Sequence, residues 1–452
     1  MAFDRKNVLI FGTGISGIAA VGLLQTTKAD IILYDSNPNL DVDNILKKLG
    51  DNFTGELILG ELPKDIIRQL DLVVLSPGVP TDIDVVNEFR DLGIPIMGEV
   101  ELAYEFEKGR VIAITGTNGK TTTTALVGEI LSTYFEKVYV VGNIGIPYTG
   151  SVLNTMDTSV TIAEISSFQL ETIKKFKPNI SAILNISPDH LDRHYTIDNY
   201  TNIKSKIISS QTEDDTCILN YDDSRLRKLE DNLKCKIIYF SSSSELESGI
   251  YLNNNNNIIY RSKNNKEIIC SIYDLKIFGK HNYENVMAAV GISIAANVPL
   301  DHIRNGIKGF KGVEHRIEYV NTIKGVKYYN DSKGTNPDAS MRAIESMQSP
   351  TLLIAGGYDK DSNYDEWIQS FGDKVKALVL LGQTKDKIAK AARDNGFNNI
   401  FIVDTLEDAV TTSANMAEDG DSVLLSPACA SWGMFSDYEE RGDLFKEYVN
   451  KL

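Results

Sequence analysis

The sequence is poor in cysteine, and the four cysteines that it has are scattered along 452 residues. None of them forms a Cys-x-x-Cys pair; they are Cys217, Cys235, Cys270 and Cys429. This pattern argues against a disulfide framework and against a zinc site. It fits a protein that works in a reducing compartment.

The sequence also lacks a long apolar run and an excess of positive charge. No stretch approaches the ~18 consecutive apolar residues of a membrane-spanning helix. The first residues run directly into a strand-like Val8–Phe11, without the apolar region of a signal peptide. A formal net charge of −16 disfavours a nucleic-acid partner, because a polyanion is repelled. We therefore expect a cytoplasmic globular protein that neither inserts into a membrane nor binds nucleic acid.

Apolar runs alternate with helical patterns along most of the chain, which predicts α/β units with parallel sheets covered by helices. Composition and pattern place unit boundaries near Glu99 and Phe310. Between about 236 and 275 the runs become short and β-like. The polar tracts Ser241–Ser244, Asn253–Asn257 and Asn264-Asn265 separate these runs, and we expect hairpin turns there.

The first glycine-rich motif is Gly12-Thr13-Gly14-Ile15-Ser16-Gly17, between a predicted strand and a predicted helix. Its glycines allow a tight turn and let backbone N–H groups approach a diphosphate. Asp35 ends the next predicted strand, where its carboxylate can hydrogen-bond a ribose or a base edge. The motif predicts a nucleotide diphosphate without specifying which one, and a purely structural turn is the alternative.

The second motif, Thr115-Gly116-Thr117-Asn118-Gly119-Lys120-Thr121, also joins a strand to a helix. Such a loop points N–H groups at phosphate, Lys120 reaches the β and γ oxygens, and the Thr121 hydroxyl can ligate Mg²⁺. The motif departs from the usual P-loop pattern because Ile114 stands where the first glycine belongs. It predicts ATP binding.

Three further residues have chemistry that suits a phosphate site. Glu164 ends a predicted strand beside the phosphate loop, where magnesium needs an oxygen ligand; a solvated strand end is the alternative. His190 follows another strand end and can ligate a metal or orient a metal-bound water, although most single histidines are structural. Lys204 lies one turn beyond Tyr200 on a helix that Thr196 can cap, and its spacing alone predicts an ordinary solvated lysine.

Taken together, the motifs resemble those of the Mur ligases of bacterial cell-wall synthesis. The similarity extends over nearly the whole chain and is strongest to the branch that adds D-glutamate to UDP-N-acetylmuramoyl-L-alanine. In chain order the segments that carry it are Ser76–Gly78, Gly116–Thr121, Gly142–Gly145, Glu164–Gln169, Asp189–Asp192, Gly279–Asn285, His315-Arg316, Asn330–Asn336 and Ser426–Trp432.

The resemblance implies a three-domain α/β protein. A Rossmann-like N-terminal domain (1–98) would bind the UDP-sugar, and a central P-loop ATPase-type domain (99–309), a parallel sheet with a small β extension, would bind ATP. A Rossmann-like C-terminal domain (310–452) would bind the amino acid. The implied reaction joins D-glutamate to UDP-N-acetylmuramoyl-L-alanine through an acyl phosphate, in peptidoglycan precursor synthesis. ATP is the implied cosubstrate, two Mg²⁺ ions are the implied cofactors, and the chain is expected to be a monomer.

The resemblance also implies roles for individual residues. Those implied for the UDP substrate are Gly14, Ser16, Gly17, Asp35, Ser36, Ser76, Asn143 and His190. Those implied for ATP are Gly116, Thr117, Asn118, Gly119, Lys120, Thr121, Asn282, Asn285, Arg316, Asp331 and Lys333. Those implied for D-glutamate are Thr335, Lys360, Ser431 and Tyr438. The metal ligands would be Thr121, Glu164, His190 and Lys204, the last as a CO₂-derived carbamate, and the catalytic residues Lys120, His190 and Lys204. Gly334, Gly433 and Tyr438 depart from residues that are frequent in the family.

The sequence leaves several alternatives open. The nearest is another ligase of the same superfamily, such as the L-alanine-adding ligase or folylpolyglutamate synthase. An NAD-dependent oxidoreductase would use Gly12–Gly17 but leaves Lys120 and Glu164 unexplained, and a regulatory P-loop ATPase would not need an acceptor. Taken singly, Asn330–Lys333 can be a turn with a helix cap, Ser426–Ala428 a strand-to-helix turn, and Arg316 one half of a surface ion pair.

Overall fold

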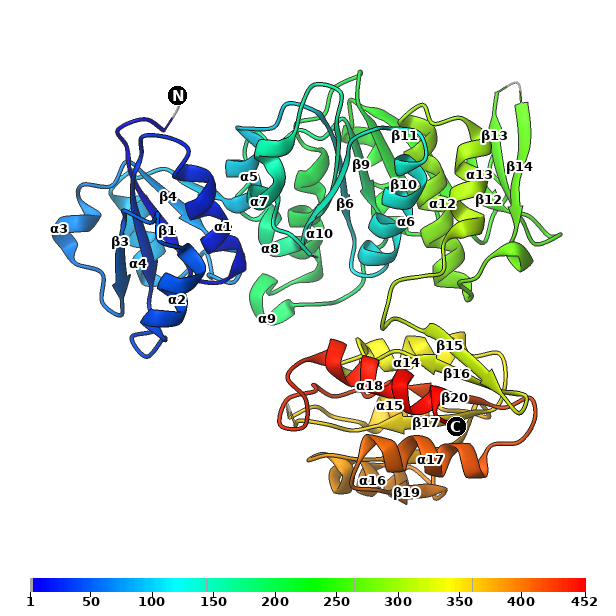
Figure 1. Ribbon diagram of the computed structural model, residues 1–452. Helices are drawn as coiled ribbons and strands as arrows, with labels where there is room; N and C mark the ends of the chain where they lie inside the picture. Colours follow the sequence, from blue (N-terminus) through cyan, green and yellow to red (C-terminus); the bar gives the residue numbers. More distant parts are fainter. Residues whose placement is uncertain (1–2, 144, 264, 360) are drawn as a thin grey trace. The chain divides into compact units, whose positions relative to one another are not determined.

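The computed structural model describes residues 3–143, 145–263, 265–359 and 361–452, so Lys360 and the first residue of the predicted Asn264-Asn265 turn lie outside the described residues. Within these ranges the chain forms three sheets of five, nine and six strands, with helices packed on them (Figure 1). The predicted α/β fold of three domains is confirmed. The first two sheets belong to one compact unit and the third to another.

The N-terminal sheet is entirely parallel and has the order β3-β2-β1-β4-β5. Strand β1 forms because its apolar side chains are buried on both faces: Val8 and Ile10 share a core with helix α1, and Leu9 and Phe11 share another with α4. The loops after β1 and β4 meet where the strand order reverses, which is the usual ligand position in an open α/β sheet. The elements are β1 (Asn7–Phe11), α1 (Ile15–Leu24), β2 (Asp30–Asp35), α2 (Val42–Leu49), β3 (Glu56–Leu59), α3 (Lys64–Ile67), β4 (Leu72–Leu75), α4 (Asp84–Asp91) and β5 (Ile96–Gly98).

The central sheet has the order β14-β13-β12-β11-β10-β9-β6-β8-β7, which places the strand of the phosphate loop, β6, between β9 and β8. Those three strands run parallel, so the residues that follow them gather at one edge of the sheet. The elements are α5 (Glu99–Tyr104), β6 (Arg110–Thr115), α6 (Lys120–Ser132), β7 (Val138–Gly142), α7 (Tyr148–Ser151), β8 (Val160–Glu164), α8 (Ser167–Leu170), β9 (Ile180–Ile183), α9 (Leu191–His194), α10 (Ile197–Ser205), β10 (Thr216–Asn220), α11 (Ser224–Arg227), β11 (Lys236–Ser241), β12 (Gly249–Leu252), β13 (Asn257–Ser262), β14 (Asn265–Ser271), α12 (Lys280–Ala295) and α13 (Leu300–Gly309).

The β extension confirms one predicted hairpin and corrects another. Asn253–Asn257 joins the antiparallel strands β12 and β13, as expected. The hairpin predicted at Ser241–Ser244 is wrong, because β11 and β12 pair in parallel. The serines bind Asp222 instead: its Oδ1 accepts from the Ser241 hydroxyl at 2.7 Å, and its Oδ2 accepts from the Ser242 N–H at 2.9 Å. The Asp222 carboxylate thus holds the serine tract at the end of β11, and the chain does not form a hairpin there.

The C-terminal sheet has the order β15-β16-β20-β17-β18-β19, with only β15 antiparallel to its neighbour among the described strands. Helices α14 to α16 share a core on one face, and α17 and α18 share a core on the other. The elements are β15 (Glu318–Ile323), β16 (Val326–Asn330), α14 (Pro337–Ser346), β17 (Thr351–Ala355), α15 (Asp365–Gln369), β18 (Val375–Leu380), α16 (Lys385–Asp394), β19 (Ile400–Ile402), α17 (Leu406–Met416), β20 (Ser422–Leu425) and α18 (Tyr438–Asn450). The loops after the neighbouring strands β16, β20 and β17 therefore meet at one edge.

None of the helices in the described part of the chain combines the length and the apolar character that crossing a membrane requires.

Candidate active site

A cavity of about 580 Å³ lies beside the first glycine loop, at the carboxyl edge of the N-terminal sheet. The central domain contributes Asn143 and Gln169 to its wall, so two domains build it. Gly17 lies behind the wall: a Cβ there would come within 1.8 Å of the Gly12 carbonyl oxygen, so this glycine allows close packing. The residues implied for the UDP substrate that line the cavity are Gly14, Ser16, Asp35, Ser36, Ser76 and Asn143.

Asp35 holds the first loop in place. Its Oδ2 accepts hydrogen bonds from the Thr13 N–H at 3.1 Å and from the Thr13 hydroxyl at 2.9 Å. Its Oδ1 accepts from the Asn37 N–H at 3.1 Å. A carboxylate has about four acceptor sites, so Asp35 can keep these bonds and still accept from a ligand hydroxyl.

The second glycine loop is held by side chains from other elements. Asn185, after β9, accepts from the Asn118 N–H through its Oδ1 at 2.9 Å and returns a bond from its Nδ2 to the Asn118 carbonyl at 3.1 Å. Gly119 has φ +81°, and a Cβ there would lie 2.1 Å from Oδ1 of Asn285 on α12. The structure thus brings Asn285 against the loop, and the Asn285 amide donates to Oδ1 of Asn282 at 3.2 Å.

Two lysine ammonium groups lie against the carbonyls of this loop. Lys120 donates to the Gly116 and Thr117 carbonyls at 2.9 Å, and Lys204 donates to the Gly116 carbonyl at 2.9 Å. The expectation from spacing alone, a solvated Lys204, is wrong: the side chain is only 1% exposed. Burial, and then the nearby Lys120 charge, lower the pKa of Lys204 well below its ordinary value.

Glu164 supplies a buried carboxylate next to the phosphate loop. It pairs in register with Ile114 of β6 and is 1% exposed. Its Oε1 accepts from the Asn143 amide at 2.8 Å, while its buried Oε2 has no hydrogen-bond partner among the described residues. An unsatisfied buried carboxylate oxygen is costly unless something else binds it, and Mg²⁺ prefers such an oxygen. These donors therefore fit a magnesium ion, and Thr121 is at the adjacent start of α6.

His190 lies near this carboxylate segment but does not line the cavity. Its backbone has φ +51°, and its side chain is about half exposed. The ring packs on Phe168 with centroids 4.8 Å apart, and Nε2 is 3.6 Å from Asp189 Oδ2. The histidine is therefore accessible to a substrate and lies one residue beyond a carboxylate.

Side-chain contacts that the sequence did not predict join the first two domains. Arg193 pairs with Glu171 at 2.6 Å and also donates to the Val79 carbonyl, in the cavity wall, at 3.0 Å. Tyr195 donates to the Asp82 carboxylate in the same N-terminal segment. Arg193 and Tyr195 follow Asp189-His190 closely, but their partners in the N-terminal domain, Val79 and Asp82, are more than a hundred positions away in the chain.

In the C-terminal domain, the loops after β16 and β20 meet at Asp331. Its Oδ2 accepts from the Ser426 hydroxyl at 2.7 Å, and burial raises the pKa of this carboxyl to about 7. A Cβ on Gly334 would lie 2.4 Å from the same oxygen, which accounts for the glycine at that position. The Lys333 ammonium lies 5.4 Å from the centre of the Tyr438 ring.

The remaining implied residues of this domain lie nearby in the chain. Thr335 follows Lys333, and its N–H donates to the Lys333 carbonyl at 2.9 Å. Ser431, in the loop after β20, is 4% exposed. The buried Nε of Arg316 has no hydrogen-bond partner among the described residues, which does not support the surface ion pair considered above. Lys360 lies outside the described residues.

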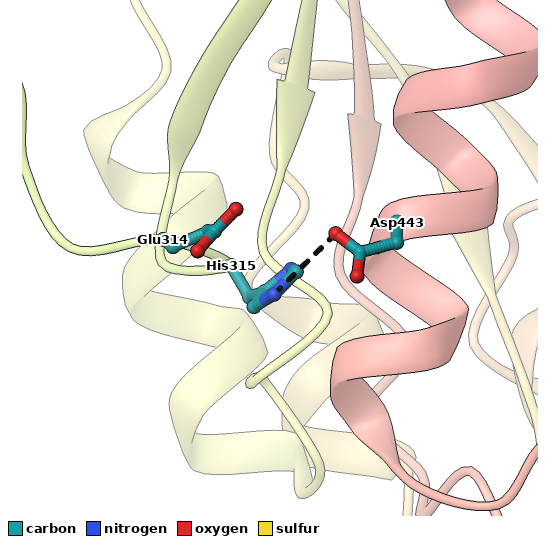
Figure 2. A group of neighbouring side chains, drawn as sticks. All are labelled: Glu314, His315 and Asp443. Atoms are coloured by element: carbon teal, nitrogen blue, oxygen red, sulfur yellow. Dashed lines mark ion pairs between the residues drawn. The ribbon is translucent and has the colours of Figure 1, made fainter. Parts of the chain in front are cut away.

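Figure 2 shows a second group with metal-ligating atoms, Glu314, His315 and Asp443. A lysine already supplies positive charge where a metal ion would: Lys446 donates to Glu314, and its ammonium lies 3.0 Å from the Asp443 carboxylate. Lys446 therefore offsets part of the negative charge of the two carboxylates.

The histidine of this cluster also has the wrong tautomer for a metal. Asn330 accepts from the Ser332 N–H through Oδ1 at 3.1 Å, so its amide nitrogen is the group that donates to His315 Nδ1 at 3.0 Å. The proton of a neutral His315 is then on Nε2, which faces Asp443 at 3.9 Å. No ligand nitrogen is left for a metal.

Comparisons with known proteins agree with this architecture. Family models described as "Mur ligase MurD-like, N-terminal domain", "Mur ligase middle domain" and "Mur ligase, glutamate ligase domain" match residues 6–98, 114–293 and 315–429. The UDP-N-acetylmuramoylalanine–D-glutamate ligase of Lachnoclostridium phytofermentans is 59% identical over 100% of this chain and 99% of its own length. The ligase of the same name from Lachnospira eligens is 52% identical over 100% of both chains.

Solved structures of related enzymes share the fold. The UDP-N-acetylmuramate-alanine ligase of Thermotoga maritima matches with a TM-score of 0.61 and 17% identity, over 99% of this chain and 100% of the other. A pseudomurein peptide ligase type C from Methanothermus fervidus matches with a TM-score of 0.58 and 17% identity, over the same shares. The high-identity relatives and the three family models decide the assignment: the chain belongs to the Mur ligase family, in the branch of the UDP-N-acetylmuramoylalanine–D-glutamate ligases.

Proposed function

We propose that the chain is an ATP-dependent ligase that joins D-glutamate to UDP-N-acetylmuramoyl-L-alanine in peptidoglycan precursor synthesis. The observation that carries this proposal is the double role of Asn143. Asn143 lines the cavity beside the first glycine loop, and its side-chain amide donates a hydrogen bond to Glu164 at the second loop. A UDP-sugar in the cavity therefore extends its carboxylate toward the phosphate loop.

The reaction begins when an oxygen of the substrate carboxylate attacks the γ-phosphorus of ATP, which releases ADP and leaves an acyl phosphate. Two anions must meet in this step, so Lys120 and the N–H groups of the loop stabilise the charge. The amine of D-glutamate then attacks the acyl carbon, loses a proton and expels phosphate. His190 is the proposed base, since it is accessible and lies beside Asp189.

Thr121, Glu164, His190 and carbamylated Lys204 are the proposed ligands of two Mg²⁺ ions. The ions would shield the phosphate oxygens from the incoming carboxylate. Carbamylation needs a neutral amine, which attacks the carbon of CO₂ and loses a proton. The lowered pKa of Lys204 favours that neutral form, and the resulting anion removes the repulsion between two ammonium groups that both contact Gly116.

The remaining assignments complete the proposal. Domains covering 1–98, 99–309 and 310–452 bind the UDP substrate, ATP and D-glutamate respectively, in a cytoplasmic monomer. The UDP-sugar contacts are Gly14, Ser16, Gly17, Asp35, Ser36, Ser76, Asn143 and His190, with Gly17 acting through packing. The ATP contacts are the loop 116–121 with Asn282, Asn285, Arg316, Asp331 and Lys333. The D-glutamate contacts are Thr335, Lys360, Ser431 and Tyr438.

The test is phosphate release from ATP with UDP-N-acetylmuramoyl-L-alanine and, separately, D-glutamate, L-glutamate, L-lysine or L-alanine. We expect sustained release with D-glutamate alone. Equal release with another amino acid, or release that needs neither acceptor nor amine, contradicts the proposed function and favours another ligase or a regulatory ATPase.

A further inference from the structure

A buried arginine joins the two C-terminal loops that carry the proposed amino-acid contacts. Arg441 is on helix α18 and is 2% exposed. Its Nε donates to the Ser332 hydroxyl at 2.9 Å and its Nη2 to the Ser332 carbonyl at 2.8 Å. Its Nη1 donates to the Cys429 carbonyl at 3.2 Å. One guanidinium thus connects the loop after β16 to the loop after β20.

The acceptors of Arg441 are unusual for a buried cation. Among the described residues it forms no ion pair with a carboxylate within 4.0 Å; the bonds go to carbonyls and a hydroxyl. Burying a charge costs free energy that an apolar core residue avoids. A guanidinium, however, presents several donors in one rigid plane, so it fixes the spacing of its acceptors as no apolar side chain can.

The bonded residues are next to the proposed D-glutamate contacts. Ser332 precedes Lys333 and is three positions before Thr335, while Cys429 is two positions before Ser431. The Ser332 hydroxyl also donates to the carbonyl of Tyr438 at 2.8 Å, at the start of the arginine's own helix. Three separate stretches of chain therefore depend on one side chain for their mutual spacing.

We propose that Arg441 is a positioning residue for D-glutamate: by holding the loops at Ser332 and Cys429 at a fixed spacing, it sets the width of the amino-acid pocket. This inference rests on the proposed function, because that function identifies the flanking residues as the amino-acid contacts. Arg441 itself touches no substrate in this scheme.

The test compares Arg441→Lys with a matched control, Phe445→Leu. Lysine keeps the charge but loses the planar fork, whereas Phe445 is a fully buried apolar core residue one turn further along the same helix. We expect the lysine variant to raise the KM for D-glutamate about 10-fold or more and to leave the KM for the UDP substrate within about twofold. The leucine variant should lower the melting temperature and change neither KM.

A second variant keeps the proposal testable if the lysine protein does not fold. Ser332→Ala removes one acceptor and keeps the guanidinium, so it should raise the KM for D-glutamate by a smaller factor. In Arg441→Ala, added guanidinium ion should restore part of the D-glutamate affinity. Both effects must appear in the KM for D-glutamate and not in that for the UDP substrate.

Two results would overturn the role of Arg441. One is a lysine variant that is less stable but has an unchanged KM for D-glutamate, which is the behaviour of a purely structural residue. The other is an equal rise in the KM for both substrates. If instead the unaltered protein shows no dependence on D-glutamate, the proposed function itself fails.

Discussion

The two glycine-rich loops share a strand–turn–helix pattern, but they are held in different ways. The first is held by its own domain: Asp35 accepts from Thr13, and Ser76 packs against Gly12. The second is also held within its own domain, but by residues much further along the chain: Asn185 after β9 and Asn285 on α12. The contacts of the first loop therefore lie within the first 76 residues, whereas those of the second extend to Asn285 on α12.

The loops also differ in charge. No lysine or arginine lines the cavity at the first loop, in the part of the chain that the structure describes. At the second, Lys120 and Lys204 both contact the Gly116 carbonyl. Backbone N–H groups and a helix N-terminus suffice to hold a diphosphate that does not react. A phosphate that is transferred develops new charge, and that requires cations at the reacting atoms.

The largest effect should come from the cation of the second loop. We expect Lys120→Ala to lower kcat by roughly 10²–10³-fold or more, because it removes charge stabilisation in the transition state. The measurement is phosphate release with all substrates present. Lys206→Ala is the control, since this half-buried lysine donates to the Glu171 carbonyl and lies outside the loop. Near-normal turnover of Lys120→Ala would show that the second loop needs no cation at the reacting phosphate.

Lys204, the second lysine at the loop, should act through its carbamylation. Lys204→Met is expected to lose roughly 10²-fold in kcat, comparable with the loss of one stabilising group. Removing CO₂ from the unaltered protein should inactivate it reversibly, and mass spectrometry should find one added CO₂ on Lys204. At a fixed concentration of dissolved CO₂, recovery should be faster at higher pH, because the neutral amine is the form that reacts. An unaltered protein that is indifferent to CO₂ contradicts the carbamate.

The lowered pKa of Lys204 also predicts how stability depends on pH. Between the lowered folded-state pKa and the ordinary value of 10.5, the unfolded chain binds a proton that the uncarbamylated folded chain does not. The free energy of unfolding should therefore rise with pH between these two pKa values. Denaturant unfolding of the CO₂-free protein should show this rise, and Lys204→Met should lack it.

Glycine substitutions separate packing from binding within the first loop. Gly17→Ala should destabilise the chain by roughly 1–3 kcal/mol, because its Cβ would lie 1.8 Å from a carbonyl oxygen. Gly14→Ala should cost less than about 0.5 kcal/mol, since nothing lies within 4 Å of its Cβ. Thermal unfolding by circular dichroism measures both. Equal destabilisation would mean that the loop is less closely packed than the structure shows.

The smallest effects should come from the side chains that hold the two loops in place by hydrogen bonds. Asn185→Ala should raise the KM for ATP by roughly 10-fold, because two bonds to Asn118 disappear together. Thr13→Val should raise the KM for the UDP substrate only about threefold, because its N–H still donates to Asp35. The two variants should act on different substrates. An effect of either variant on the other substrate would link the loops more closely than proposed.

The sequence predicted the parts of the site that depend on local pattern. Both glycine loops and the position of Glu164 follow from strand ends and turn residues that are contiguous in the chain. Strands such as β3 and β15 are hard to predict from the pattern, because their residues are mostly half-buried and mix apolar with polar side chains. At the edge of a sheet, the alternation of apolar and polar residues is too weak to identify a strand.

The contacts that hold the site together could not be predicted, because they join residues that are far apart in the chain. Helical spacing shows which residues share a face of α10, but not that this face meets the phosphate loop, so the burial of Lys204 was missed. Arg441 and Ser332 are 109 positions apart, and Arg193 and Val79 are 114 positions apart. Only the folded chain brings such pairs together. Family resemblance singled out Lys204 as a metal ligand, which stays a prediction, and it pointed to neither Arg193 nor Arg441.

The central claim is that the substrate carboxylate is activated by phosphoryl transfer at the second loop. It is tested most directly by labelling both oxygens of the alanyl carboxylate of UDP-N-acetylmuramoyl-L-alanine with oxygen-18. The account predicts that each turnover with ATP and D-glutamate transfers one labelled oxygen to the released phosphate and leaves the other in the new amide. Released phosphate without the label would contradict the acyl phosphate and the chemistry assigned to this loop.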